Sequence, residues 1–281
     1  MTDENQLSGP EFLKQFEDNW RTDMGSIIFG EDAILRGKSV LHDFDDCTWM
    51  EYFLFGITGQ KLEHYSKFVE GVWRLSTSYP DPRLWNNRVA ALAGTTRSTA
   101  VLGVAAGIAV SEATNYGLRP IKGAVDFLYR AKHKINEGKS ISEIANEELQ
   151  KHRSIYGYGR PLADQDERVE PMLDFARSLG MDKGTYLSLA FDIEKYLQTT
   201  RLKYRINIAG VVAGLAADQG RTSEEHYYMA ALSFVAGILP CYIDTYNHGE
   251  GTFFPISVDR INCINKHANS QRRWTCPTTG A

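Results

Sequence analysis

Cysteine is scarce in this sequence, and the few cysteines form no ligand pattern. The 281 residues contain four cysteines, Cys47, Cys241, Cys263 and Cys276, with no Cys-x-x-Cys pair and no histidine at metal-ligand spacing. A chain of this length can bury a core without crosslinks. Disulfides and structural zinc are therefore not required, and we expect reduced thiols, no metal and a cytoplasmic location.

The chain also lacks a strong charge imbalance and a long apolar run. Its 31 lysines and arginines face 35 acids, giving a net charge of -4 with no basic stripe. This balance argues against nucleic acid as a partner. No run reaches the roughly 18 apolar residues that a membrane span needs, and residues 1–5 are acidic instead of forming an apolar signal segment. We therefore expect no membrane association.

Apolar residues recur three or four positions apart over most of the chain, which predicts an all-α fold. The segment from 90 to 109 is rich in Ala and Gly, so we expect one or two central buried helices there. Ser140 with Glu143, and Thr222 with Glu225, have capping-box spacing. The predicted helices cover residues 10–20, 49–55, 62–75, 84–110, 124–134, 140–150, 169–179, 184–199, 208–217 and 222–243.

One short segment breaks the helical pattern. Residues 26–37 place two apolar stretches around a Gly-Glu-Asp turn. Alternating apolar stretches on either side of a turn are typical of a β-hairpin. We predict a small N-terminal hairpin, and we expect residues 115–124 to form a loop that leads into the next helix.

The segment from 154 to 168 has the composition of an anion-binding loop. It reads Ser-Ile-Tyr-Gly-Tyr-Gly-Arg-Pro-Leu-Ala-Asp-Gln-Asp-Glu-Arg. Glycines allow a main chain to approach a ligand closely, and arginines hold carboxylates or phosphates through a fixed fork of N–H donors. A solvated turn between helices explains the same residues, so the rest of the chain must decide.

Four motifs in order resemble a known family. They are Gly-x-x-x-x-x-Arg-Gly at 30–37, Asn-Arg-Val-Ala-Ala at 87–91 with Ala-Ala-Gly-Ile-Ala at 105–109, Gly-Tyr-Gly-Arg-Pro-Leu at 157–162 with Asp-Glu-Arg at 166–168, and Ile-Asn-Ile-Ala-Gly at 206–210. Their order and spacing over roughly residues 25–245 resemble the citrate synthase superfamily. This chain has a short form of the family's sequence, which is most similar to citryl-CoA lyase and to the C-terminal module of ATP citrate lyase.

The resemblance implies an architecture and a ligand class. It implies an all-α, citrate synthase-like fold with a short N-terminal β-hairpin, in which residues 1–122 and 209–281 form a large helical domain and residues 123–208 a smaller inserted one. It also implies a cleft between the domains, an intimate homodimer, and an anionic or acyl-CoA substrate, with coenzyme A as its thioester.

The chain departs from the family at the residues that carry the reaction. Members polarise a carbonyl with two histidines and move a proton with an aspartate. Here Arg160 replaces one histidine, Lys122 corresponds to the other if the loop is matched at Pro120, and Ala209 replaces the aspartate. Ile238 stands where a later substrate arginine of the family is expected, just after Gly237. Alanine cannot remove a proton, so the standard citrate synthase mechanism is not expected.

The cations at these positions suggest a rewired basic site. Lys122 and Arg160 add two cations beside Arg168, which suits a carboxylate, a phosphate or an enolate. Lysine also permits a Schiff base. The alternative interpretations are a solvated Lys122 at a helix start and an Arg160 that pairs with Asp164 or Asp166.

The site predicted from the sequence has three groups of residues. The catalytic group is Arg160, Lys122 and Tyr158; the substrate-binding group is Arg168, Asn207 and His248; and the cofactor-binding group is Gly159, Pro161 and Leu162. Tyr158, Asp126, His248 and Asp244 are the candidate replacement acids or bases.

Three functions fit these observations. The first is an enzyme with altered carbon–carbon bond chemistry on a CoA thioester or carboxylate. The second is a non-catalytic subunit that binds CoA or a carboxylate. The third is an enzyme of another class that uses the basic cleft without CoA.

Overall fold

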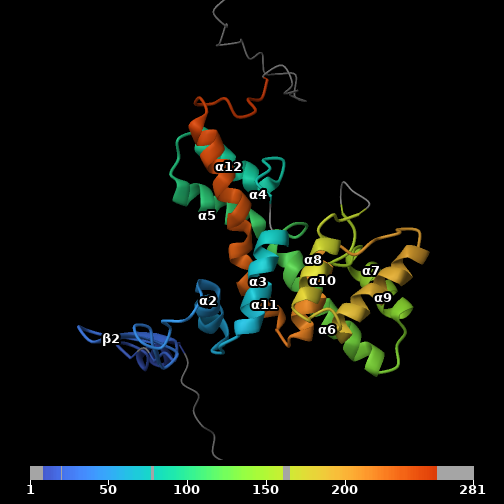
Figure 1. Ribbon diagram of the computed structural model, residues 1–281, viewed down its shortest axis with the longest axis horizontal. Helices are drawn as coiled ribbons and strands as arrows, with labels where there is room; N and C mark the ends of the chain where they lie inside the picture. The colour runs from blue at the N-terminus through green and yellow to red at the C-terminus, as the bar shows by residue number, and fades with distance from the viewer. Residues whose placement is uncertain (1–8, 20, 77–78, 161–164, 258–281) are drawn as a thin grey trace, which may run out of the picture.

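The computed structural model describes residues 9–19, 21–76, 79–160 and 165–257, and within them the chain is mostly helical (Figure 1). A small antiparallel sheet of β1 (Gly25–Ile28), β2 (Asp32–Leu35) and β3 (Lys38–Ser39) projects to one side. Gly30 and Gly37 turn the chain between these strands with φ of 76° each, a conformation that glycine adopts without a Cβ penalty. The hairpin prediction is confirmed, and β3 was not predicted.

Two helices follow the sheet and lead into the main core. α2 (Trp49–Thr58) begins at a capping box of Thr48 and Glu51, and α3 (Glu63–Ser76) buries Phe68 and Val72 along one face. Gly71 of α3 lies against α8 (Val169–Ser178) so closely that a Cβ there would overlap the Phe175 ring. Ser76, the last residue of α3, lies near the start of α8, because its carbonyl accepts from Arg168 Nη1. The candidate site forms there.

A group of helices surrounds α10 (Ile208–Asp218). They are α6 (Leu118–Asn136), α7 (Ile141–His152), α8 (Val169–Ser178) and α9 (Thr185–Thr199). Nine of the eleven residues of α10 are buried, because small residues let its neighbours approach: a Cβ on Gly214 would lie 2.9 Å from the Leu187 Cα. These helices share one apolar core with α2 and α3. The predicted capping box of Ser140 and Glu143 is confirmed at the start of α7.

The remaining helices form a second core. α4 (Trp85–Thr95), α5 (Ala100–Ser111) and α12 (Val235–Asn247) stand away from the α10 group in Figure 1. α11 (Ser223–Ala230) and the short 3-10 helix η1 (Ala231–Phe234) continue into α12. Gly94 allows α4 to touch the α12 backbone, since a Cβ there would lie 2.5 Å from Tyr242 O. The capping box of Thr222 and Glu225 is confirmed.

Several predicted elements need correction. α1 (Gly9–Lys14) ends well before residue 20, and none of its residues is buried. Residues 100–109 are not a central buried helix: Gly103 and Gly107 face α12, whereas Val101 on the opposite side is 77% exposed. Small residues pack closely on one face and leave the other uncovered.

α6 begins earlier than the sequence indicated. The predicted loop at 115–124 ends at Gly117, whose φ of 85° turns the chain, and Pro120 and Lys122 already lie in the first turns of α6. Proline fits there because a first-turn N–H has no helical partner. The boundary expected between residues 122 and 123 falls inside this helix, and the division into two domains stays a prediction.

The run from α11 to the end of α12 is long and apolar enough to cross a membrane by length and composition. It has 25 residues, a mean hydropathy of 1.3 over its most apolar window, and half of that window is buried. α12 packs along α4 in the second core. A core helix passes the same test, so we assign no membrane span.

Candidate functional site

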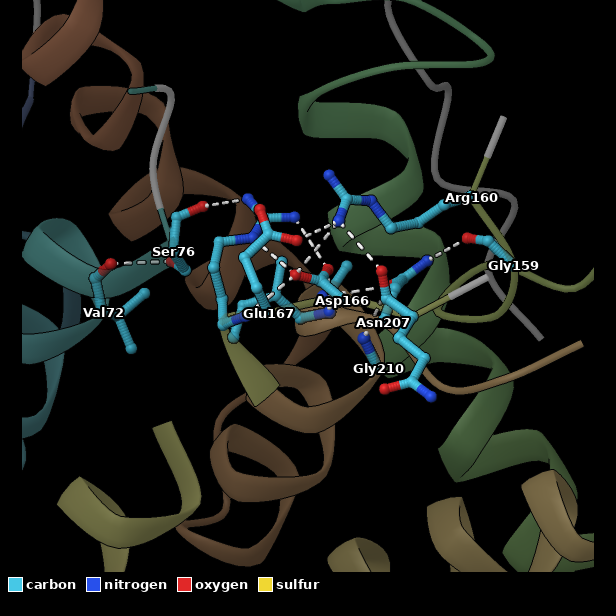
Figure 2. A network of polar contacts seen from close by, with 12 residues as sticks. Val72, Ser76, Gly159, Arg160, Asp166, Glu167, Asn207 and Gly210 are labelled. Atoms are coloured by element: carbon cyan, nitrogen blue, oxygen red, sulfur yellow. Dashed lines mark hydrogen bonds and ion pairs between the residues drawn. The ribbon is translucent and has the colours of Figure 1, made fainter. Parts of the chain in front are cut away.

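Two arginines of the predicted anion loop meet on one buried carboxylate (Figure 2). Arg168 donates from Nε to Asp166 Oδ1 and from Nη2 to Asp166 Oδ2, both at 2.8 Å. Arg160 places Nη1 3.7 Å from the same Oδ1. The Asp166 side chain is 0% exposed. The fork geometry fixes both partners of the Arg168 pair, so Asp166 is a structural part of the loop.

The loop is tied to the first turn of α10. Asp166 Oδ2 accepts from the Ile208 N–H at 2.9 Å. Asn207 caps α10, because its Oδ1 accepts from the Ala209 and Gly210 N–H groups, while its Nδ2 donates to Gly159 O at 2.8 Å. Asn207 therefore holds the loop and the helix start together, in keeping with the amides favoured at caps.

The backbone geometry at Gly157 requires a glycine. Its φ is +92°, and a Cβ at Gly157 would lie 2.8 Å from the Gly210 Cα. The Gly157 carbonyl also accepts from the Asn207 N–H at 2.9 Å. Two backbones touch at this point, and a side chain on either residue would separate them.

Burial and charge act on Asp166 in opposite directions. Burial raises the pKa of the Asp166 carboxyl, but the hydrogen bonds and charge of Arg168 and the Ile208 N–H outweigh it, so the pKa lies below its usual range. Burial likewise lowers the pKa of Arg168, and the bonds to Asp166 raise it overall. Both groups are charged at neutral pH. Arg168 further donates from Nη1 to Ser76 O at 3.0 Å, which joins α3 to the loop.

Arg160 has a second, more exposed acid. Its Nη1 lies 2.5 Å from Glu167 Oε2 and donates to Gln165 O at 3.2 Å. The Glu167 side chain is 61% exposed, against 29% for Arg160. The two arginines are therefore balanced by two acids, and the ion pair of Arg160 with Asp166 is the one that the alternative interpretation of Arg160 named.

Two tyrosines missed by the sequence interpretation lie within electrostatic range of these charges. The pKa of Tyr79 is raised by burial, and Arg168, Glu167, Asp166 and Arg160 all act on it. Burial raises the pKa of Tyr116 to about 12, and Arg168 opposes that rise. Both phenols are protonated at neutral pH and can donate hydrogen bonds.

Buried asparagines position both tyrosines. The Tyr116 hydroxyl donates to Asn86 Oδ1 at 2.8 Å, and Asn87 Nδ2 donates to the carbonyls of Tyr79 and Asp81. In the sequence, the Asn-Asn pair at 86–87, polar on a buried helix face, is the signal that could have indicated these tyrosines.

Two residues predicted as catalytic have other partners. Lys122 Nζ lies 2.7 Å from Glu224 Oε1 and over the Tyr227 ring, on the side of α6 that faces α11. Glu224 raises the pKa of Lys122, so the lowered pKa that a Schiff base needs is not present. Tyr158 is buried, and its hydroxyl donates to Ala190 O at 2.8 Å. Their catalytic roles stay predictions.

The remaining predicted residues are dispersed. Gly159 joins the loop to Asn207, whereas Pro161 and Leu162 lie outside the described residues. His248 follows the outer end of α12, away from α8 and α10 in Figure 1, with its Nδ1 2.7 Å from Asp244 O. Asp126 pairs with Arg130. No group of three potential metal ligands occurs among the described residues.

Two surface cavities border α9, away from the loop of residues 157–168. A cavity of about 460 Å³ borders the first turn of α9, between Lys132 of α6 and Lys183, and one of about 370 Å³ lies on the other side of α9. Neither includes a residue of the loop from 157 to 168 or of its partners. The candidate site is therefore described by its charged cluster.

The comparisons with known proteins decide the fold. Citryl-CoA lyase from Hydrogenobacter thermophilus superposes with a TM-score of 0.74 at 18% identity, over 92% of this chain and 97% of that one. The chain has the citrate synthase fold. The all-α prediction and the resemblance to citryl-CoA lyase are confirmed at the level of fold.

Two further structures extend the likeness. ATP citrate lyase from Methanosaeta concilii, in complex with (3S)-citryl-CoA, gives a TM-score of 0.74 at 16% identity over 92% of this chain and 44% of that one. Citrate synthase from Thermoplasma acidophilum gives 0.59 at 16% identity over 82% of this chain and 59% of that one. The chain thus spans under half of the ATP citrate lyase. No protein-family model and no curated sequence matches it.

Proposed function

We propose that this chain binds a CoA thioester or a carboxylate beside the loop of residues 157–168 and acts on it in carbon–carbon bond chemistry, using groups other than the histidines and aspartate of citrate synthases. The observation that carries the proposal is the guanidinium of Arg160, held beside the buried Asp166–Arg168 pair with its Nη1 3.7 Å from Asp166 Oδ1. Fixed arginine forks suit the carboxylates of such substrates.

The fold supports the ligand class. The solved structures with this fold include a citryl-CoA lyase and an ATP citrate lyase in complex with citryl-CoA. In this chain the protonated phenols of Tyr79 and Tyr116 lie within electrostatic range of Arg168. The Tyr79 phenol would supply a hydrogen-bond donor for an oxygen that gains charge, which is one of the two groups that such a reaction needs. The Tyr116 hydroxyl already donates to Asn86 Oδ1 and would act by positioning.

A second candidate is a non-catalytic subunit that binds the same ligands. Ala209 is the observation that favours it, because it stands at the start of α10 with no acid or base of its own, and its N–H is already bonded to the Asn207 cap. Removing a proton from carbon needs a base within reach. The enzyme therefore requires a base from elsewhere, and the binding subunit requires none.

One pair of measurements separates these candidates. Calorimetry with citryl-CoA, acetyl-CoA and citrate measures binding, and a spectrophotometric assay for oxaloacetate release from citryl-CoA measures turnover. Binding with turnover supports the enzyme, and binding without turnover supports the subunit. No binding of any of the three ligands contradicts both.

Arg160→Gln is the informative variant for this experiment. We expect it to weaken binding by about tenfold or more, since losing a charge-assisted contact is worth about 1.5–3 kcal/mol. Arg177→Gln is the matched control: Arg177 is an exposed arginine on the neighbouring α8, paired with Asp174. Equal affinities of the two variants would show that Arg160 does not touch the ligand.

We further propose that the chain is a homodimer joined through its second core. Apolar side chains remain exposed on the helices of that core, among them Val101 and Leu102 of α5 and Ile243 of α12. Apolar patches of this kind mark association surfaces. Light scattering should give twice the 31.6 kDa chain mass, and Leu102→Asp should shift it towards the monomer. A monomeric wild type would contradict this assembly.

A further inference from the structure

We propose that the Glu167 carboxylate occupies the place on Arg160 that a ligand carboxylate takes, so that the ligand must displace Glu167 in order to bind. The inference rests on the proposed function, because it concerns the ligand of the same loop. Glu167 would be a competitor within the protein itself, and it would lower the affinity of the site for its ligand.

The two acids of the cluster differ in how firmly they are held. Asp166 is fully buried and receives bonds from both ends of the Arg168 fork and from the Ile208 N–H. It cannot leave without exposing a buried charge on Arg168. Glu167 is 61% exposed, and its side-chain bond goes to Arg160 Nη1. Of the two acids, only Glu167 is free to exchange.

Arg160 is built to accept a replacement. Its nearest approach to the buried acid is 3.7 Å, longer than a hydrogen bond, so Asp166 contributes charge but does not occupy the fork. The Gln165 carbonyl oxygen accepts from the same Nη1 that binds Glu167. Because the Glu167 side chain is exposed, a carboxylate from solution can reach this nitrogen and take the Glu167 position.

The expected effect follows from the strength of an exposed ion pair. Such pairs contribute little because solvent screens them. Removing the Glu167 carboxylate as a competitor should therefore tighten ligand binding by about two- to fivefold at low salt, and by less at high salt. Glu167→Ala and Glu167→Gln should both show this gain.

Glu170→Gln is the matched control. Glu170 lies in the first turn of α8 and is exposed, with no ion pair to Arg160. Its loss removes the same charge three residues away, and we expect its affinity for ligand to change by less than twofold. The comparison therefore separates displacement of Glu167 from a general change in charge.

The experiment is calorimetry of citrate and citryl-CoA with wild type, both Glu167 variants and Glu170→Gln, followed by a crystal structure of the wild type with whichever ligand binds. A gain confined to the Glu167 variants, with a ligand carboxylate on Arg160 and Glu167 turned away, supports the proposal. Equal gains in all variants, or a bound ligand with the Arg160–Glu167 pair intact, overturn it while leaving the proposed function in place. No binding by any protein overturns both.

Discussion

Replacing Asp166 with asparagine should be the most damaging single charge change in the candidate site. The substitution keeps the shape of the side chain and removes its charge. Arg168, whose side chain is 19% exposed, would then hold a charge without a counterion, and Arg160 would keep Glu167 but lose the charge of Asp166. Breaking a buried ion pair by removing one partner costs about 3–5 kcal/mol, and we expect the lower part of that range because Arg168 keeps its bond to Ser76 O.

Chemical denaturation and thermal melting measure this cost. A loss of about 3 kcal/mol corresponds to a fall in Tm of roughly 6–12 °C for a chain of this size. Asp174→Asn is the control, because its pair with Arg177 is exposed and such pairs are worth at most about 1 kcal/mol. A loss below about 1 kcal/mol for Asp166→Asn, or equal losses for the two variants, would refute the view that Asp166 anchors the loop.

The pH dependence of the same pair has a defined sign. The folded-state pKa of Asp166 is below its usual value of 3.8. A lowered pKa stabilises the folded state above the unfolded pKa, and this contribution is lost as the pH falls through the folded value. The stability difference between wild type and Asp166→Asn should therefore be constant from about pH 5 to 7 and shrink below about pH 4.

Three further predictions concern other parts of the molecule. His226 is buried, and burial lowers its pKa from 6.5 to about 4. Wild type should therefore lose on the order of 3 kcal/mol of stability as the pH falls from 6.5 to 4. In denaturant titrations His226→Phe should flatten the dependence of the unfolding free energy on pH, and an unchanged dependence would contradict this prediction. Gly157→Ala should cost about 2–4 kcal/mol, because it combines a positive φ with contact to the Gly210 backbone, and a melting curve like that of wild type would contradict it. Lys122→Met should change the free energy of unfolding by less than about 1 kcal/mol, since its pair with Glu224 is exposed, and a larger loss would show an unseen role.

The helices and the loop motif were predictable because they depend on local patterns. Apolar spacing located α8, α9 and α10 to within a residue or two, and the two predicted capping boxes formed because each needs only residues three apart. The glycines of the loop also follow from local need: Gly157 has a positive φ.

The partners of the charged residues were not predictable in the same way. Lys122 pairs with Glu224, about one hundred residues later, and no sequence spacing indicates that contact. The sequence likewise did not predict the exposed face of α5, because its alanines and valines fit either a core or an uncovered surface. The sequence indicated Glu167 only as part of a motif, and no helix or strand spacing predicts its bond to Arg160, seven residues earlier.

Titration of wild type and Arg160→Gln with citryl-CoA tests the central claim most directly. The account predicts saturable binding by wild type that weakens by about tenfold or more in Arg160→Gln and stays within twofold in Arg177→Gln. Absence of binding by wild type, or equal affinity in both variants, would contradict it.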